Sequence, residues 1–126
     1  MFALNTGLRA GEQWGLTWND LGLDATQPQV TLSATKNGTV RHIPLNHYAR
    51  AALESLAQEK MLGTRVFPQQ RYRGWFEGAL ATAGIQNFTW HCLRHTFASR
   101  LVMVGVDLRT VAELMGHKSL QMTMRY

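Results

Sequence analysis

The stretch WHCLRHTFAS, residues 90–99, is the most informative about the fold because it presents two different faces at helical spacing. His91 and Arg94 are three positions apart and so share one side of a helix, while Leu93 and Phe97 are four apart and share another. The pattern predicts an α-helix with an apolar face packed into a core. Its other face would carry a fixed cation beside an imidazole that titrates near neutrality.

Helical spacing recurs on both sides of this segment, and capping residues mark several of the expected boundaries. Asparagine and aspartate are favoured N-caps, and glycine is the residue that most often follows a helix C-terminus. The expected helices are a short one over 8–15, one beginning after Asn46, one over 70–83 with an apolar stripe (Tyr72, Trp75, Phe76, Ala79, Leu80, Ala83), one over 89–105, one over 107–116 and a last turn from Ser119.

Residues 16–45 have strand character instead. Val30 and Leu32 alternate with polar residues, and residues 40–44 form a second short β-like run. Asn37-Gly38 between them supplies the positive φ angles that a tight hairpin needs, which places Lys36 at or beside the hairpin tip. We therefore predict an α+β fold that is mainly helical, with a small three-stranded antiparallel sheet near the N-terminus.

Composition narrows the class of protein. The 126 residues include 13 Lys and Arg against 8 Asp and Glu, which gives a net charge of +5 and a pI near 10.0. With 45% hydrophobic and 17% charged residues the chain is expected to fold as one domain. The single cysteine, Cys92, excludes an internal disulfide framework or a multi-cysteine zinc site. The positive excess suits a polyanionic partner such as nucleic acid.

The polar face of the 89–105 helix suits a phosphate ligand, because arginine can donate to two nonbridging oxygens and histidine can move a proton. A solvated helix face is the alternative. His91 and His95 have the i, i+4 spacing of a metal pair, but no third ligand is indicated. Cys92 and His91 diverge by about 100° on a helix and cannot easily form a thiol couple. No GxxxxGK loop occurs, so a nucleotide-driven mechanism is not expected.

Taken together, five segments resemble the catalytic domain of the tyrosine recombinases, the phage integrase family. TGLRAGE at 6–12 is similar to the first-arginine motif, and ATKNG at 34–38 is similar to the hairpin-lysine motif. WHCLRHTFAS at 90–99 resembles the HxxR box, LMGHKS at 114–119 the segment of the second histidine, and MTMRY at 122–126 the nucleophile segment. All five follow in the family's order.

The resemblance implies a catalytic role for six residues. Tyr126 would attack a scissile DNA phosphate and form a 3′-phosphotyrosyl intermediate. Arg9 and Arg94 would clamp the nonbridging oxygens, and His117 would add a further hydrogen bond. The last two roles are proton transfers.

Lys36 would protonate the departing 5′-oxygen, and His91 would assist proton transfer to and from the tyrosine. Two further residues would support the site. Glu12 would hold the first-arginine segment from the same helix, and His95 is expected to be a buried, hydrogen-bonded histidine.

The resemblance also implies the partners. Double-stranded DNA is the expected substrate, bound by a homotetramer in the full-length protein, with no metal, cofactor, nucleotide or membrane, in a bacterial cytoplasm at the nucleoid. Against the family pattern we expect residues 1–126 to be a catalytic domain truncated at its N-terminus and lacking the C-terminal tail. The candidates for contacts with the DNA backbone are Lys60, Arg65, Arg71 and Arg73.

Two other functions remain open from the sequence. A type IB topoisomerase has similar arginine, lysine, histidine and tyrosine chemistry but relaxes supercoils without exchanging strands between partners. A remnant of an integrase could bind DNA without cutting it. The segment GHKS at 116–119 favours the recombinase over the topoisomerase.

Overall fold

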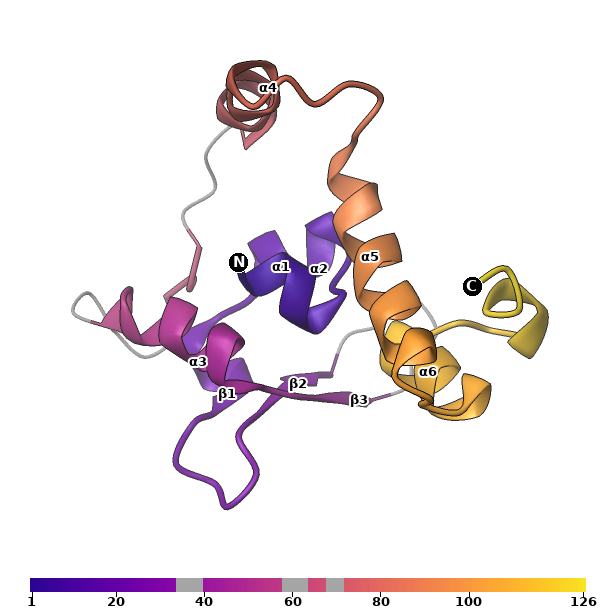
Figure 1. The fold of residues 1–126 in the computed structure, drawn as a ribbon. Coiled ribbons are helices and arrows are strands. Elements are labelled where there is room, and N and C mark those ends of the chain that lie inside the picture. The colour runs from indigo at the N-terminus through magenta and orange to yellow at the C-terminus, as the bar shows by residue number, and fades with distance from the viewer. Residues whose placement is uncertain (34–39, 58–63, 68–71) are drawn as a thin grey trace.

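The computed structural model describes residues 1–33, 40–57, 64–67 and 72–126, and its fold is mainly helical with one small sheet (Figure 1). None of the helices described there is long and apolar enough to cross a membrane. The helices are α1 (Phe2–Thr6), α2 (Ala10–Gly15), α3 (His47–Glu54), α4 (Tyr72–Thr82), α5 (Trp90–Met103) and α6 (Leu108–Met115), the 3-10 turns are η1 (Trp18–Asp20) and η3 (Leu120–Met122), and the strands are β1 (Leu21–Gly22), β2 (Gln29–Leu32) and β3 (Arg41–Pro44).

The sheet has three antiparallel strands in the order β1-β2-β3, which confirms the predicted α+β class. Val30 pairs with Ile43 in the centre of the sheet, and both side chains are fully buried. Alternation along β3 buries Arg41 on the same face as Ile43. The predicted hairpin tip with Lys36 lies outside the described residues.

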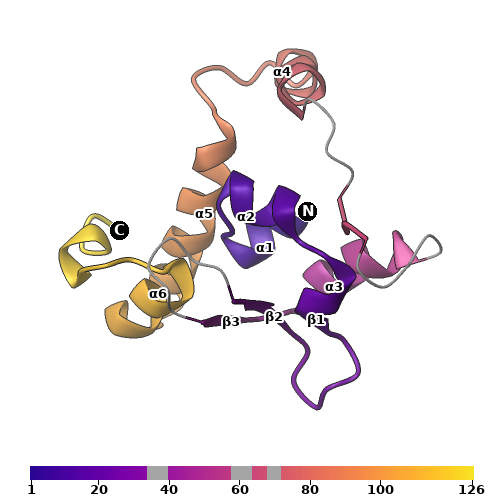
Figure 2. The same cartoon turned by 180° about the vertical axis from the view of Figure 1, so that it is seen from behind.

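Helices α1 and α2 occupy the middle of the molecule, with α3 on one side and α5 on the other, and the sheet closes the layer beneath them (Figures 1 and 2). Helix α6 packs against both α5 and β3, which brings the end of the chain to the same side as α5. The core beneath α1 and α3 comprises Phe2, Leu8, Leu16, Trp18, Val30, Ile43, Leu45, Ala49, Leu53 and Val66.

Two helix starts form as their capping residues predict. Asn46 accepts a hydrogen bond from the Ala49 backbone N–H at 2.9 Å and begins α3. Asp107 accepts from the backbone N–H groups of Arg109 and Thr110, both at 3.0 Å, and begins α6. Each cap satisfies N–H groups that have no partner inside the helix.

The N-terminal segment differs from the prediction. Helix α1 begins at Phe2 and ends at Gly7, whose φ of 61° is the left-handed conformation that glycine adopts readily. No capping side chain precedes this five-residue helix, so it depends on packing against α3 and α5. Arg9 was expected inside a helix over 8–15, but it is the N-cap of α2.

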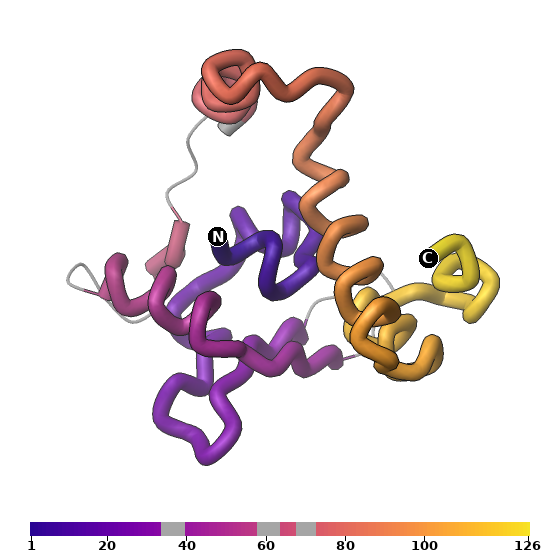
Figure 3. The backbone as a smooth tube through the Cα atoms, viewed as in Figure 1, coloured from indigo at the N-terminus to yellow at the C-terminus, as the bar shows by residue number. Residues whose placement is uncertain are grey.

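Helix α4 forms within the range predicted for it, 70–83, but the apolar side chains described on it are not part of the buried core. Trp75 is 52% exposed and Ala79 is exposed. In Figures 1 and 3 the helix lies apart from the central layer. The described ring contacts between α4 and α5 all go to Trp90: Trp75 and Phe76 meet it with centroids 5.9 and 5.0 Å away. The core itself is filled by the other helices and the sheet.

Candidate active site

Helix α5 buries Arg94, although the sequence predicted that its buried face would be the one with Leu93 and Phe97. Arg94 is 3% exposed and Ala98 is fully buried, whereas Leu93, Phe97 and Leu101 are only half-buried. A solvated helix face was the alternative to a phosphate-binding face for this arginine. The packing of α1 and α6 against α5 instead surrounds the guanidinium with backbone carbonyls.

The Arg94 guanidinium is held by the C-termini of two helices. Nη1 donates to the carbonyl of Gly7 after α1 at 2.6 Å, and Nη2 donates to the carbonyl of Met115 at the end of α6. Helix C-termini carry partial negative charge, which favours a cation there. Burial, followed by the charge of Arg9, lowers the pKa of Arg94 to about 10, so it stays protonated at neutral pH. Each terminal nitrogen keeps a second N–H for another acceptor.

Arg9 lies beside it and is more open to solvent, with 44% of its side chain exposed. Its Nη1 donates to Glu12 Oε1 at 2.8 Å, and its Nη2 donates to the Gly116 carbonyl at 3.1 Å. Arg9 and Arg94 therefore both donate to carbonyls at the end of α6. The exposed part of the Arg9 guanidinium remains available to an anion from solvent.

The Glu12 carboxylate is the acidic partner of this cluster. Oε2 accepts from the Arg9 backbone N–H and from Nη2 of Arg41, both at 2.8 Å. Burial raises the pKa of Glu12, but the Arg9 backbone hydrogen bond and the Arg41 charge outweigh that effect, and the pKa lies below its ordinary value. Glu12 thus offsets part of the positive charge while it holds Arg9 in place.

His117 follows Gly116, whose φ of 59° ends α6 in the left-handed conformation. Its Nδ1 is 2.7 Å from the Thr123 hydroxyl, which is fully buried. Burial, followed by the charges of Arg94 and Arg9, lowers the pKa of His117 to about 4. At neutral pH the ring is therefore an uncharged hydrogen-bonding group.

This depressed pKa predicts a measurable titration. We expect the Hε1 resonance of His117 to titrate near pH 4 in wild type, and at higher pH in Arg94→Gln because one positive neighbour is removed. Between an unfolded pKa near 6.5 and the folded value near 4, the unfolded chain binds the extra proton, so stability falls as pH decreases through that window. A His117 titration midpoint at or above pH 6.5 in wild type would contradict the lowered pKa of this histidine.

Tyr126 lies at the same site. Its hydroxyl is 2.6 Å from Nδ1 of His95, and its ring is parallel to that of His117 at a centroid distance of 6.4 Å. His95 is half-buried rather than buried as expected, and the His91 ring meets it edge-on at 4.6 Å. The direct partner of the tyrosine is thus His95, while His91, which was expected to serve it, is one ring further away.

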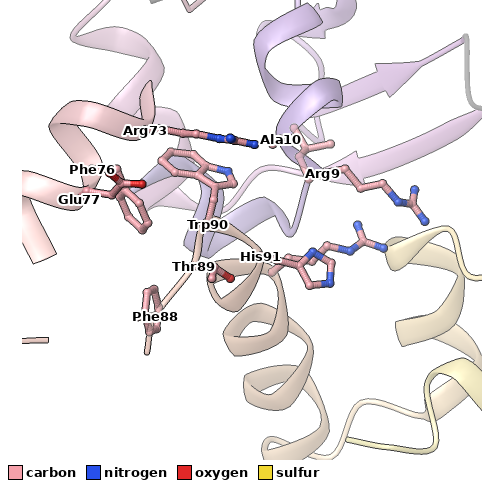
Figure 4. A pocket seen from close by; sticks show the side chains of 11 residues that line it. Arg9, Ala10, Arg73, Phe76, Glu77, Phe88, Thr89, Trp90 and His91 are labelled. Atoms are coloured by element: carbon pink, nitrogen blue, oxygen red, sulfur yellow. The ribbon is translucent and has the colours of Figure 1, made fainter. Parts of the chain in front are cut away.

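A cleft of about 400 Å³ opens beside these residues, between α4 and the N-terminus of α5. Figure 4 shows Arg73 alongside the Trp90 indole and pointing toward Ala10, with Arg9 and His91 on the opposite side. Aromatic side chains and cations therefore line one continuous surface that leads to the two arginines.

The structure thus groups five of the six predicted catalytic residues, together with Glu12 and His95. Lys36, Lys60 and Arg71 lie outside the described residues. Arg65 is exposed and forms a β-bridge with Thr17, and neither residue lines the cleft.

Comparison with known proteins shows which family has this fold. All of the chain, residues 1–126, matches the model of the phage integrase family. The chain belongs to the phage integrase family. This integrase-family chain is 32% identical to the tyrosine recombinase XerC of Natranaerobius thermophilus, in an alignment that covers 96% of the chain and 46% of that relative. It therefore spans about half the length of such relatives.

Solved integrase structures share the fold. The catalytic domain of bacteriophage HP1 integrase is 32% identical, with a TM-score of 0.76 over 98% of this chain and 68% of that one. The Tn1549 transposon integrase in complex with circular intermediate DNA is 26% identical, with a TM-score of 0.80 over 99% of this chain and 50% of that one. These likenesses cover nearly all of this chain.

Three residues of this integrase-family site were not anticipated from sequence. Arg41 could have been found from the alternation of RHIP, which puts it on the face of Ile43. Thr123 carries no signal beyond its six-residue distance from His117. Arg125 adds positive charge that helps lower the pKa of both His91 and His117, although burial and the charge of Arg94 have larger effects on both.

Proposed function

We propose that this protein is a site-specific DNA recombinase or integrase that cleaves and rejoins DNA strands through a 3′-phosphotyrosine intermediate. The observation that carries the proposal is the meeting of Arg9, Arg94 and His117 with a tyrosine whose hydroxyl contacts an imidazole. This set supplies a nucleophile, a proton acceptor and fixed donors for a phosphate. Phosphoryl transfer needs little more than positioning and charge stabilisation.

The proposed cleavage step exchanges one phosphate ester for another. The Tyr126 oxygen forms a bond to phosphorus as the bond to the 5′-oxygen breaks, and the phenol proton passes to His95 and the adjoining His91. Arg9 and Arg94 donate to the nonbridging oxygens through N–H groups not used by their carbonyl acceptors, and neutral His117 donates a further hydrogen bond. Lys36 would give its proton to the departing 5′-oxygen.

The reverse of this step rejoins the strand. A 5′-hydroxyl attacks the phosphotyrosine and restores the tyrosine, and its proton returns to Lys36. Because each step replaces one phosphate ester bond with another, no ATP is consumed. Fixed cations take the place that a metal ion has in other phosphoryl-transfer enzymes.

We propose double-stranded DNA as the substrate, bound by a homotetramer. The relative from Tn1549 is described in complex with DNA, and the chain's net charge of +5 favours a polyanion. Arg73 lines the same cleft as Arg9 and is the best-placed contact for the DNA backbone among the described residues. The other proposed contacts are Lys60, Arg65 and Arg71. With DNA as substrate, the protein would act in a bacterial cytoplasm at the nucleoid.

A selection for covalent capture tests the function with a pool of DNA sequences in place of one chosen target. The chain is incubated in EDTA with duplexes of randomised sequence that each carry one nick. When cleavage occurs near the nick, the short strand with the new 5′-hydroxyl dissociates, so that rejoining cannot occur and the adduct persists. We expect a subset of strands to remain bound after denaturation in detergent, with a common sequence around the cleavage point. The same pool without nicks serves as the control. Failure to retain any strand above that control would contradict the proposal.

Plasmid substrates that carry the selected sequence separate the enzyme classes. Recombinant products are expected. Relaxation of supercoils without recombinants would favour a topoisomerase, and salt-sensitive binding without an adduct would favour a DNA-binding remnant.

A further inference from the structure

Arg41 is a buried cation that no step of the proposed reaction uses. It is 7% exposed and lies on the core face of β3 beside Ile43. Buried arginine costs free energy unless it is paired, and an apolar residue of similar size at such a position is often neutral or stabilising. Its partners therefore indicate why a cation is present in this strand.

Those partners are shared with the two active-site arginines. Nη2 of Arg41 donates to Glu12 Oε2 at 2.8 Å, and that same oxygen accepts from the Arg9 backbone N–H. Nη1 of Arg41 donates at 3.3 Å to the Met115 carbonyl, which also accepts from Arg94. Arg41 thus has one acceptor in common with each active-site arginine.

Gly116 leaves room for this arrangement. A Cβ atom built at Gly116 would overlap Nη1 of Arg41, so the close approach of the guanidinium to the end of α6 requires glycine there. The Gly116 carbonyl accepts from Arg9, and the next residue is His117. The contact therefore joins β3 to the backbone that holds one side of the site.

We propose that Arg41 is a positioning residue that fixes the Glu12 carboxylate and the C-terminus of α6, so that Arg9 and Arg94 meet the scissile phosphate in register. Arg41 does not touch DNA in this proposal. The inference rests on the proposed function for its kinetic consequence, but the coupling of Arg41 to Glu12 can be measured without any DNA.

The kinetic test compares two substrates. One is the nicked duplex recovered by the selection, and the other carries a methylphosphonate at the scissile position, where a methyl group replaces one charged oxygen and lessens the need for cations. We expect Arg41→Gln to slow adduct formation by about 10- to 100-fold on the phosphate and by much less on the methylphosphonate. Arg41→Lys, which keeps the charge, should be intermediate. Arg50→Gln, on the exposed surface of α3, should match wild type on both substrates.

An equal loss on both substrates would show that Arg41 serves folding alone and would overturn the proposal. The second measurement follows the side-chain carbon of Glu12 by ¹³C NMR during an acid titration. We expect the Glu12 pKa to be higher in Arg41→Gln than in Arg41→Lys or wild type, because a positive neighbour is lost. An unchanged Glu12 pKa in a folded Arg41→Gln variant would also overturn the proposal.

The kinetic comparison and the Glu12 titration test different parts of the proposal, so a negative result in one does not decide the other. If wild type forms no adduct with any duplex, the proposed function is wrong while the Glu12 titration still decides whether Arg41 holds that carboxylate. If Arg41→Gln does not fold, Arg41→Lys is compared with wild type on the two DNA substrates instead. An Arg41→Lys variant with the wild-type ratio of adduct-formation rates on phosphate and methylphosphonate would overturn the proposal that Arg41 is a positioning residue.

Discussion

Tyr126→Phe abolishes the covalent protein–DNA adduct while the fold and DNA binding remain. The substitution removes only the hydroxyl, which is the proposed nucleophile and the group 2.6 Å from His95 Nδ1. The ring can keep its parallel contact with His117. Because no other atom replaces the missing oxygen as nucleophile, the expected loss is complete rather than partial. The measurement is detergent-resistant strand capture on the nicked duplex.

Tyr48→Phe is the matched control, because Tyr48 is 52% exposed on α3 and lacks any described contact with the site. It should form the adduct at the wild-type rate. Persistence of the adduct in Tyr126→Phe would show that another residue is the nucleophile. An unfolding transition well below that of wild type would show instead that the hydroxyl contact is mainly structural.

Arg94→Gln slows adduct formation by two to three decades, equivalent to about 3 to 4 kcal/mol of transition-state stabilisation. Gln has no charge and cannot donate at once to two helix-end carbonyls and a phosphate. The measurement is the single-turnover rate of adduct formation at saturating DNA.

Arg94→Lys separates charge from geometry. Lysine keeps the positive charge but has one terminal nitrogen, so it cannot reproduce the two donors that reach Gly7 and Met115. We expect its rate to remain far below that of wild type. Arg109→Gln, an exposed site on α6, should have no effect. A wild-type rate in Arg94→Lys would mean that charge alone suffices and that the carbonyl clamp does not matter.

Local signals predicted most of the helices and the sheet. The boundaries of α3 and α6 follow from Asn46, Asp107 and Gly116, whose side-chain or backbone preferences act within one turn. Helix α1 has Gly7 after its C-terminus but lacks a capping side chain at its start, and it depends on packing against α3 and α5. The range of α4 was predicted from its apolar stripe, but such a stripe indicates only which face is apolar and not what covers that face.

The site residues were predicted by their motifs, but their surroundings were not. A solvated face remained an alternative for Arg94 from the sequence alone, because its burial depends on carbonyls that lie 87 and 21 positions away in the chain. The contact of Tyr126 with His95 likewise joins residues 31 positions apart. Pairings of this kind arise from tertiary packing, and periodicity within one element carries no information about them.

Mapping the residue to which DNA becomes attached is the most direct test of the proposal that Tyr126 is the nucleophile. The trapped adduct is digested with nuclease and protease, and the peptides are sequenced by mass spectrometry. We expect a nucleotide linked through its 3′-phosphate to the hydroxyl oxygen of Tyr126, with Tyr48 unmodified. Attachment at any other residue, or through a 5′-phosphate, would contradict the proposal.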